Sequence, residues 1–198
     1  AINRQEMVDI LFFGYGKICN GPFLLDSFAY NENIKPITQD INKAKALLKD
    51  AGYDENNPFT FELVTNTGND TRINAAQILQ YQLEKTGVKM SIKVMEWQAF
   101  LNTVVHPKKF QAVLLGWSLA LMPDAFPLWH SSSSKLGGFN LVSYENEKVD
   151  KLIEQGSTTI NRDELGNIYK EIFKIITDDL PYLFLYIPDA ITVINKDI

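Results

Sequence analysis

The sequence has 198 residues, of which 45% are hydrophobic, so it carries enough apolar material for one compact domain with its own core. Charged residues make up 22% of the chain with both signs interspersed, which argues against long disordered tracts. The formal net charge is -5 and lysine and arginine are not clustered, which argues against binding to nucleic acid.

Neither a membrane span nor a metal site is expected. The longest apolar stretch, 112–122, stops at Pro123 and is well short of the roughly 20 residues that cross a bilayer. The single Cys19 cannot form an internal disulfide. Because Cys19, His106 and His130 are scattered without ligand spacing, we expect no metal ion and no other cofactor.

Three segments carry apolar residues at helical spacing between recognisable caps and stops. From cap to stop they are Asp40 to Gly52, Asn69 or Asp70 to Gly87, and Asn161 to Pro181. The last begins with an Asn161 and Glu164 pair that resembles a capping box. Shorter helices are expected over 4–12, 97–106 and 147–155.

Short segments rich in β-branched and aromatic residues lie between these helices and predict strands. They cover 59–65, 88–95, 110–116 and 182–187, with a further candidate at 191–194. The centre of the chain therefore alternates strand and helix, with connections that suit right-handed parallel crossovers. This order predicts an α/β domain with a mixed, mainly parallel sheet flanked by helices.

Ligands of open α/β sheets bind outside the carboxyl ends of parallel strands, where three loops are expected to meet. The loops are Asn66-Thr67-Gly68-Asn69, Glu96-Trp97 and Trp117-Ser118. The first is polar and opens a helix, whose free N–H groups favour a carboxylate or another acceptor. The third sets an aromatic face beside a hydroxyl, which suits a bound extended chain. We predict ligand contacts in the first and third loops, and a core position for Trp97 at the start of its helix.

Two motifs are similar to motifs of enzymes, and only the first leaves an enzymatic alternative. The run Gly116-Trp117-Ser118-Leu119-Ala120 is similar to the nucleophile elbow of α/β-hydrolases, which leaves a serine hydrolase using Ser118 as an alternative. Pro123 argues against the helix that should follow, and His130 is too near for the usual order of serine, acid and histidine. Gly14-Tyr15-Gly16-Lys17 has glycines at dinucleotide-loop spacing, but Pro22 follows where a phosphate-binding helix should begin.

A series of short motifs runs in order along nearly the whole chain. They are Ala1-Ile2-Asn3-Arg4, Gly14-Tyr15-Gly16, Gly21-Pro22, Ala44-Lys45-Ala46-Leu47-Leu48, Ala51-Gly52-Tyr53, Glu96-Trp97, Gly116-Trp117-Ser118, Trp129-His130-Ser131-Ser132, Gly138-Phe139-Asn140, Tyr144-Glu145-Asn146 and Pro181-Tyr182-Leu183-Phe184-Leu185-Tyr186. Their shared order resembles the second lobe of the oligopeptide and dipeptide group of ABC-importer binding proteins, the bacterial extracellular solute-binding protein family 5.

The resemblance implies a lobe of the type II periplasmic-binding-protein kind. Residues 1–198 would form one domain, the carboxy-terminal lobe, while the first lobe lies outside this chain, which starts at Ala1 and reads as a piece of a longer protein. In such proteins the lobes close over a peptide or similar solute, and the closed form docks on a membrane permease. The resemblance further implies a monomeric, non-enzymatic protein in the periplasm or anchored outside the membrane by lipid. Phe139 and Asn140 would border the cleft.

One departure from the resemblance concerns the solute. In classical peptide binders the loop after the tryptophan carries an aspartate that pairs with the peptide amino terminus, whereas this chain has Ala120 near that position. Met122 also replaces the first acid of the usual Asp-Pro-Asp run and leaves Pro123-Asp124. A buried amine without a partner charge costs several kcal/mol, so the solute stays open between a free peptide, a blocked peptide and a sugar. A chaperone-like or signalling role is a third alternative.

Overall fold

The computed structural model describes residues 1–135, 137–192 and 194–195. In chain order the elements are α1 (Arg4–Phe12), β1 (Gly16–Ile18), α2 (Ile41–Asp50), β2 (Thr60–Asn66), α3 (Asp70–Glu84), β3 (Lys89–Met95), α4 (Trp97–Phe100), the π-helical turn η1 (Leu101–Val105), β4 (Ala112–Val113), α5 (Phe126–Trp129), the 3₁₀ turn η2 (Ser131–Ser134), α6 (Glu147–Thr158), α7 (Arg162–Asp179) and β5 (Tyr186–Pro188). None of the described helices is long and apolar enough to cross a membrane.

A parallel sheet forms the centre of the domain. Its strand order is β3-β2-β4, with α3 connecting β2 to β3, and α4 with η1 connecting β3 to β4. β2 and β3 pair in register from Thr60 opposite Lys89 to Asn66 opposite Met95. A separate antiparallel pair of β1 and β5 completes the sheet structure. The predicted α/β class with a mainly parallel arrangement is confirmed.

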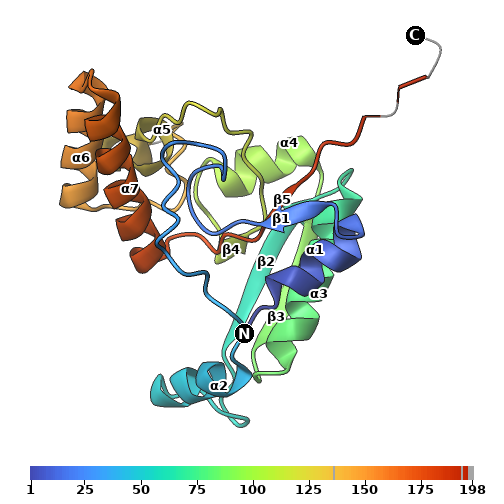
Figure 1. The fold of residues 1–198 in the computed structure, drawn as a ribbon. Helices are drawn as coiled ribbons and strands as arrows, with labels where there is room; N and C mark the ends of the chain where they lie inside the picture. The colour runs from blue at the N-terminus through green and yellow to red at the C-terminus, as the bar shows by residue number, and fades with distance from the viewer. Residues whose placement is uncertain (136, 193, 196–198) are drawn as a thin grey trace.

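Helices cover both faces of the parallel sheet, which explains why β2 has neighbouring apolar residues at its buried end (Figure 1). Leu63 packs with Met7 of α1 and Leu79 of α3 on one face. The next residue, Val64, points to the other face because side chains alternate along a strand, and it packs with Phe100 of α4. The carboxyl half of β2 is therefore buried on both sides.

A second core lies away from the sheet, between α5, α6 and α7. Figure 1 shows α6 and α7 side by side at one end of the molecule. Their apolar stripes enclose Trp129 of α5 together with Ile172 and Phe173 of α7, and the segment 23–30 packs against them. This helical part carries the loop that follows α5 toward the carboxyl edge of the sheet.

The three long predicted helices are present with side-chain caps. Asn69, one of two candidates, caps α3 by accepting a hydrogen bond from the Arg72 N–H, and Asp40 and Asn161 cap α2 and α7. The expected helix over 97–106 divides into α4 and η1. Although α2 has the predicted amphipathic pattern, it has no buried residue.

The predicted strand over 110–116 is paired only at β4. At its start the Gln111 side chain takes the place of a backbone partner, because its Oε1 accepts a 2.8 Å hydrogen bond from the Glu62 N–H. Beyond β4 a single backbone bond continues, from the Leu114 N–H to the carbonyl of Val64 at 3.0 Å. The ladder is therefore short, although the chain keeps the predicted direction.

The prediction for 182–187 was wrong in its bounds. The ordered strand is β5, and it pairs antiparallel with β1, which the sequence did not predict. Gly16 permits this pairing, since a Cβ there would lie 3.1 Å from the carbonyl oxygen of Ile187. Tyr182 and Phe184 pack instead against the ring of Trp129. The candidate strand at 191–194 lies partly outside the described residues, and 191, 192 and 194 are in no strand.

Candidate functional site

The carboxyl ends of the three parallel strands lie together, as predicted, and hydrogen bonds join the segments that leave them. The Thr67 N–H, just after β2, donates to the carbonyl of Met95 at the end of β3 over 2.8 Å. On the other side, the Thr65 hydroxyl donates to the carbonyl of Leu114 after β4 over 3.2 Å. This edge of the sheet is therefore a connected surface rather than three independent loops.

Arg72, in the first turn of α3, contacts the first two loops and lies near Gly116, which precedes the third. Its Nη1 donates a 2.7 Å hydrogen bond to Oδ1 of Asn66, in the first loop. Its guanidinium carbon lies 5.8 Å from the centre of the Trp97 ring, in the second loop. Next to the third loop, a Cβ on Gly116 would lie 3.7 Å from Nη2. Sequence reasoning missed Arg72, although a cation in the first helical turn opposes the helix dipole and is a signal worth following.

The predicted residues of the first loop hold Arg72 in place. Asn66 is 6% exposed, and its Nδ2 donates to the carbonyl of Thr67 over 2.7 Å, so its oxygen faces the guanidinium. Asn69 is used as the helix cap. Gly68 adopts φ +78°, in the left-handed region that favours glycine, so the chain can turn sharply into α3. Thr67 is exposed between them.

The third loop presents an exposed aromatic pair. Trp117 is 40% exposed and Phe139 is 54% exposed, and their ring centres lie 5.9 Å apart at an interplanar angle of 83°. Ser118 is exposed beside them. Burial raises the pKa of Tyr182 to about 12, an effect that its neighbour Trp117 partly offsets. The buried Tyr182 hydroxyl nevertheless has no partner with hydrogen-bond geometry among the described residues.

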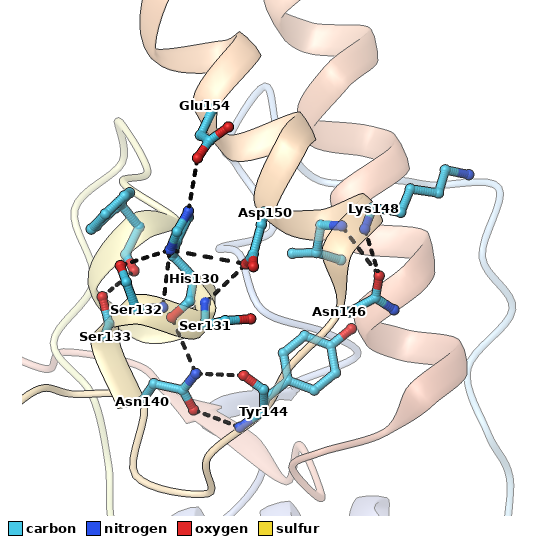
Figure 2. Close-up of polar contacts among 12 residues, drawn as sticks. His130, Ser131, Ser132, Ser133, Asn140, Tyr144, Asn146, Lys148, Asp150 and Glu154 are labelled. Carbon is cyan, nitrogen blue, oxygen red and sulfur yellow. Dashed lines mark hydrogen bonds and ion pairs between the residues drawn. The ribbon is translucent and has the colours of Figure 1, made fainter. Parts of the chain in front are cut away.

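Asn140, predicted to border the cleft with Phe139, is fully buried. Its Nδ2 donates to the carbonyls of His130 and Tyr144 over 3.3 and 2.8 Å, and its Oδ1 accepts from the Tyr144 N–H over 2.9 Å (Figure 2). All the polar groups of this side chain are thus used inside the loop. Asn140 shapes the loop that carries Phe139 and does not offer a free group to a ligand.

The geometry does not provide Ser118 with a catalytic base. Among the described residues, neither His106 nor His130 is hydrogen-bonded to Ser118, and residues 114–125 form no helix. His130 instead caps the turn η2, because its Nδ1 accepts a hydrogen bond from the Ser132 N–H over 3.1 Å. Its Nε2 lies 3.4 Å from Oε1 of Glu154 (Figure 2). Phe126 stacks on the imidazole with 4.3 Å between ring centres.

Other predicted features of the region are placed as follows. Trp97 is 38% exposed, which corrects the expectation of a core position, because Phe100 and the Arg72 guanidinium contact its ring without enclosing it. Asp124 accepts a 3.0 Å hydrogen bond from the Phe126 N–H, so one of its oxygens is used in a turn. In the described part of the chain, no three His, Cys, Asp or Glu side chains gather in a way that could hold a metal ion.

Known proteins resemble the chain in sequence and structure. The family model of the bacterial extracellular solute-binding proteins, family 5 Middle, matches residues 1–139. The oligopeptide-binding protein AppA of Bacillus subtilis is 33% identical over 96% of this chain and 37% of its own length. The nickel-binding protein NikA of Staphylococcus aureus is 28% identical over 100% of this chain and 40% of its own.

Solved structures of peptide-binding proteins are also similar to this chain. AppA of Bacillus subtilis in complex with a nonapeptide superposes with a TM-score of 0.86 at 32% identity, covering 94% of this chain and 40% of AppA. DppA of Helicobacter pylori in complex with the peptide STSA gives 0.83 at 28% identity, covering 94% of this chain and 36% of DppA.

These relatives confirm the predicted type II periplasmic-binding-protein fold and give no support to a serine hydrolase. The chain spans about two fifths of the length of the relatives it matches. The family match, the fold and an exposed aromatic pair at the carboxyl edge of a parallel sheet agree with one another. The chain belongs to the bacterial extracellular solute-binding proteins of family 5.

Proposed function

We propose that residues 1–198 form the second lobe of a two-lobed, extracytoplasmic solute-binding protein of an ABC importer. The family membership and the two-fifths coverage of the relatives support a lobe rather than a complete binding protein. The single observation that carries the binding role is the exposed pair of Trp117 and Phe139 beside the carboxyl ends of three parallel strands. That edge is where open α/β sheets bind ligands.

In this proposal Trp117 packs against the solute, and Phe139 holds the Trp117 ring in its orientation. The rings stand edge to face, so the Trp117 ring can cover an apolar part of a ligand while Phe139 supports it from the side. Ser118 and Thr67 are exposed and can donate to or accept from the ligand backbone. Asn66, Gly68 and Asn69 act by shaping the first loop, and Asn140 by shaping the loop of Phe139.

The solute is a peptide or a similar small molecule. Relatives are named for oligopeptides, glutathione and nickel, and the two solved neighbours described above, AppA and DppA, hold peptides. The side chains of residues 115–122 include no acid, so this lobe offers no carboxylate there for a free amino terminus. We infer that an amine, where the solute has one, is recognised outside this segment.

We propose that the partner that receives the solute is a membrane permease, because the solved relative DppA is an ABC transporter-associated periplasmic binding protein. Closure of two lobes over the solute would create the surface on which the permease docks. We propose that the protein acts as a monomer outside the cytoplasmic membrane, in the periplasm or held by a lipid anchor. Neither nucleic acid nor a cofactor has a part in this function.

The test is a thermal-shift and calorimetric screen of the full-length protein that contains this chain, against peptides with free and blocked amino termini and against oligosaccharides. For a ligand that binds, Trp117→Ala should weaken affinity by about tenfold or more, since buried tryptophans dominate binding energy. The matched control is Tyr81→Ala, an exposed aromatic residue near the carboxyl end of α3. Unchanged affinity in the Trp117 variant would overturn the proposed site.

A further inference from the structure

His130 is a buried histidine that contacts three elements of the helical part of the molecule. It follows α5, its side chain caps the turn η2, and its ring lies against α6 (Figure 2). The residue is only 9% exposed, and Phe126 of α5 stacks on the imidazole. Because both ring nitrogens face protein atoms, the contacts of the ring depend on which nitrogen carries a proton.

The hydrogen bonds assign the ring to its neutral form. Nδ1 accepts a hydrogen bond from the Ser132 N–H over 3.1 Å and lies 2.8 Å from the Ser132 hydroxyl oxygen. A ring nitrogen that accepts an N–H has no proton of its own, so the proton is on Nε2. Nε2 lies 3.4 Å from Oε1 of Glu154. Neutral His130 therefore accepts at the start of η2 and donates toward α6.

Protonation would reverse the role of Nδ1. An imidazolium carries hydrogens on both nitrogens, so the Ser132 N–H would face another donor and lose its acceptor. Oδ1 of Asp150 lies 4.0 Å from Nδ1 and is an anionic acceptor for the added hydrogen. That oxygen already accepts a hydrogen bond from the Ser131 N–H over 2.8 Å. A proton on Nδ1 therefore removes one side-chain acceptor from η2 and competes for the other.

The charged groups that face the ring come from one element. They are Asp150 and Glu154 of α6, whose side chains are 20% and 65% exposed. The elements α5 and η2 contain no charged residue. The lysines of α6 form ion pairs with other acids, Lys148 with Glu171 and Lys151 with Glu147. The imidazolium would thus find partners of opposite charge on α6 while it loses its contact with η2.

The turn η2 supports the loop that bears Phe139. The Ser133 carbonyl accepts a hydrogen bond from the Asn140 N–H over 3.3 Å, and the His130 carbonyl accepts one from Asn140 Nδ2 over 3.3 Å. Asn140 follows Phe139 directly in the chain, and the Phe139 ring stands edge to face with Trp117. A displacement of η2 therefore moves Phe139 relative to Trp117.

We propose that His130 is a pH-dependent switch, which holds the Phe139 loop in place when the ring is neutral and loosens that loop when the ring gains a proton. This role rests on the solute-binding function proposed above and adds regulation to the same site. Histidine commonly changes charge between about pH 5 and 8. The protein would therefore hold its solute at neutral pH and bind it less tightly in acid.

The first experiment needs no ligand. Amide hydrogen exchange of the full-length protein is compared at about pH 7 and about pH 5, after correction for the intrinsic effect of pH on exchange. Protection over 137–143 should fall about tenfold in acid, as expected when η2 loses one or two hydrogen bonds. Protection over α3 should stay the same, because α3 has no contact with His130 among the described residues.

Substitutions assign the effect to His130. His130→Asn keeps an oxygen that can accept the Ser132 N–H but has no titratable ring, so its loop should be equally protected at both pH values. His130→Gln provides a second non-titrating side chain if the first variant does not fold. His106→Asn is the matched control, because His106 is exposed and is the other histidine of this chain. The control should lose protection in acid as the wild type does.

The second experiment measures affinity at the same two pH values. The ligands are pools of pentapeptides with free or blocked ends that contain no aspartate, glutamate or histidine, so their charge changes little in this range. Wild-type protein and His106→Asn should bind about three- to tenfold less tightly in acid, because a smaller fraction of the protein has the loop in place. His130→Asn should bind equally at both pH values.

The outcomes separate the two proposals. The switch is overturned if wild-type protection over 137–143 does not change with pH, or if both His130 variants retain the change. An equal loss of protection over α3 would show that acid destabilises the whole domain, and it would also overturn the switch. If no pool binds at either pH, the proposed binding of peptides fails, while the exchange data still decide whether His130 controls the loop. If peptides bind equally well at both pH values although the loop loosens, control of binding by His130 is overturned.

Discussion

Gln82 and Asn3 exchange two hydrogen bonds in the way that two paired backbones do. The Asn3 N–H donates to Oε1 of Gln82 over 2.8 Å, and Nε2 of Gln82 donates back to the Asn3 carbonyl over 3.1 Å. Nε2 also donates to Glu6 over 2.9 Å, and the Gln82 side chain is fully buried. One amide thus joins the start of α1 to α3, the helix that carries Arg72.

Replacing Gln82 should weaken the contact between α1 and α3 and lower the stability of the protein. In Gln82→Ala, the Asn3 N–H loses its partner and the Asn3 carbonyl keeps only the Met7 N–H at 3.4 Å, so the free energy of unfolding should fall by about 2 to 4 kcal/mol, since each lost buried bond costs roughly 1 to 3 kcal/mol. Urea denaturation measures the change. Gln77→Ala is the control, because Gln77 lies on the exposed side of α3 and should change stability little. Equal values for the two variants would show that the bridge contributes nothing.

Two glycines packed near aromatic rings should respond in opposite directions to the same substitution. A Cβ at Gly21 would overlap the ring of Phe173, which is fully buried, so Gly21→Ala should destabilise the protein by about 1 to 3 kcal/mol. A Cβ at Gly166, inside α7, meets only Phe28 at 4.0 Å, so Gly166→Ala should stabilise it by about 0.5 to 1 kcal/mol. The unfolding temperatures of the two variants measure these effects, and shifts of the same sign in both variants would contradict the packing around these glycines.

The long helices, their caps and the parallel centre could be predicted from the sequence because each depends on local signals. Asn69, Asp40 and Asn161 precede periodic apolar residues, and a capping side chain needs only the next turn of its own helix. The antiparallel pair was not predictable in this way. β1 contains Gly16, a poor strand residue, and its pairing depends on Ile187 from the far end of the chain.

The meeting of the loops at the carboxyl ends of the strands could be predicted, but the contacts within these loops could not. The strand-end rule identified the loops of Asn66 and Trp117. It could not show that the side-chain oxygen of Asn66 accepts a hydrogen bond from Arg72, because that contact depends on how the loop turns into α3. Nor could helical periodicity show that Trp97 stays half exposed, since the pattern marks a face and not how fully a neighbour covers it.

Lys108 should control the order of the loop that bears Phe139. Its Nζ donates to the carbonyls of Ser134 and Asn140 over 2.5 and 2.8 Å and to the Ser143 hydroxyl over 2.8 Å. Lys108→Met removes these three bonds, so amide hydrogen exchange over 137–143 should accelerate and ligand affinity should fall. Mass spectrometry of the exchanged peptides measures the first effect.

The control is the adjacent Lys109→Met. Lys109 is exposed, and among the described residues its side chain has no recorded partner. Exchange over 137–143 should be as slow in this variant as in the wild type. Acceleration of the same size in both variants would attribute the effect to lost surface charge rather than to the bonds of Lys108.

Tyr182 should make stability fall at high pH. Its pKa is raised by burial to about 12, whereas an unfolded tyrosine ionises near about 10. Below the lower value both states keep the proton and the full stability is present. Between the two values only the unfolded state loses the proton, so stability falls as pH rises through this window.

Tyr182→Phe should therefore reduce the loss of stability at high pH. It should not lower stability at neutral pH, because the buried hydroxyl that it removes has no hydrogen-bond partner among the described residues. Urea unfolding at several pH values measures both effects. Tyr144→Phe is the contrasting variant, since the Tyr144 hydroxyl donates to Asp179 over 2.6 Å and its loss should destabilise the protein by about 1 to 3 kcal/mol at neutral pH. A similar neutral-pH loss in Tyr182→Phe would mean that its hydroxyl has a partner after all.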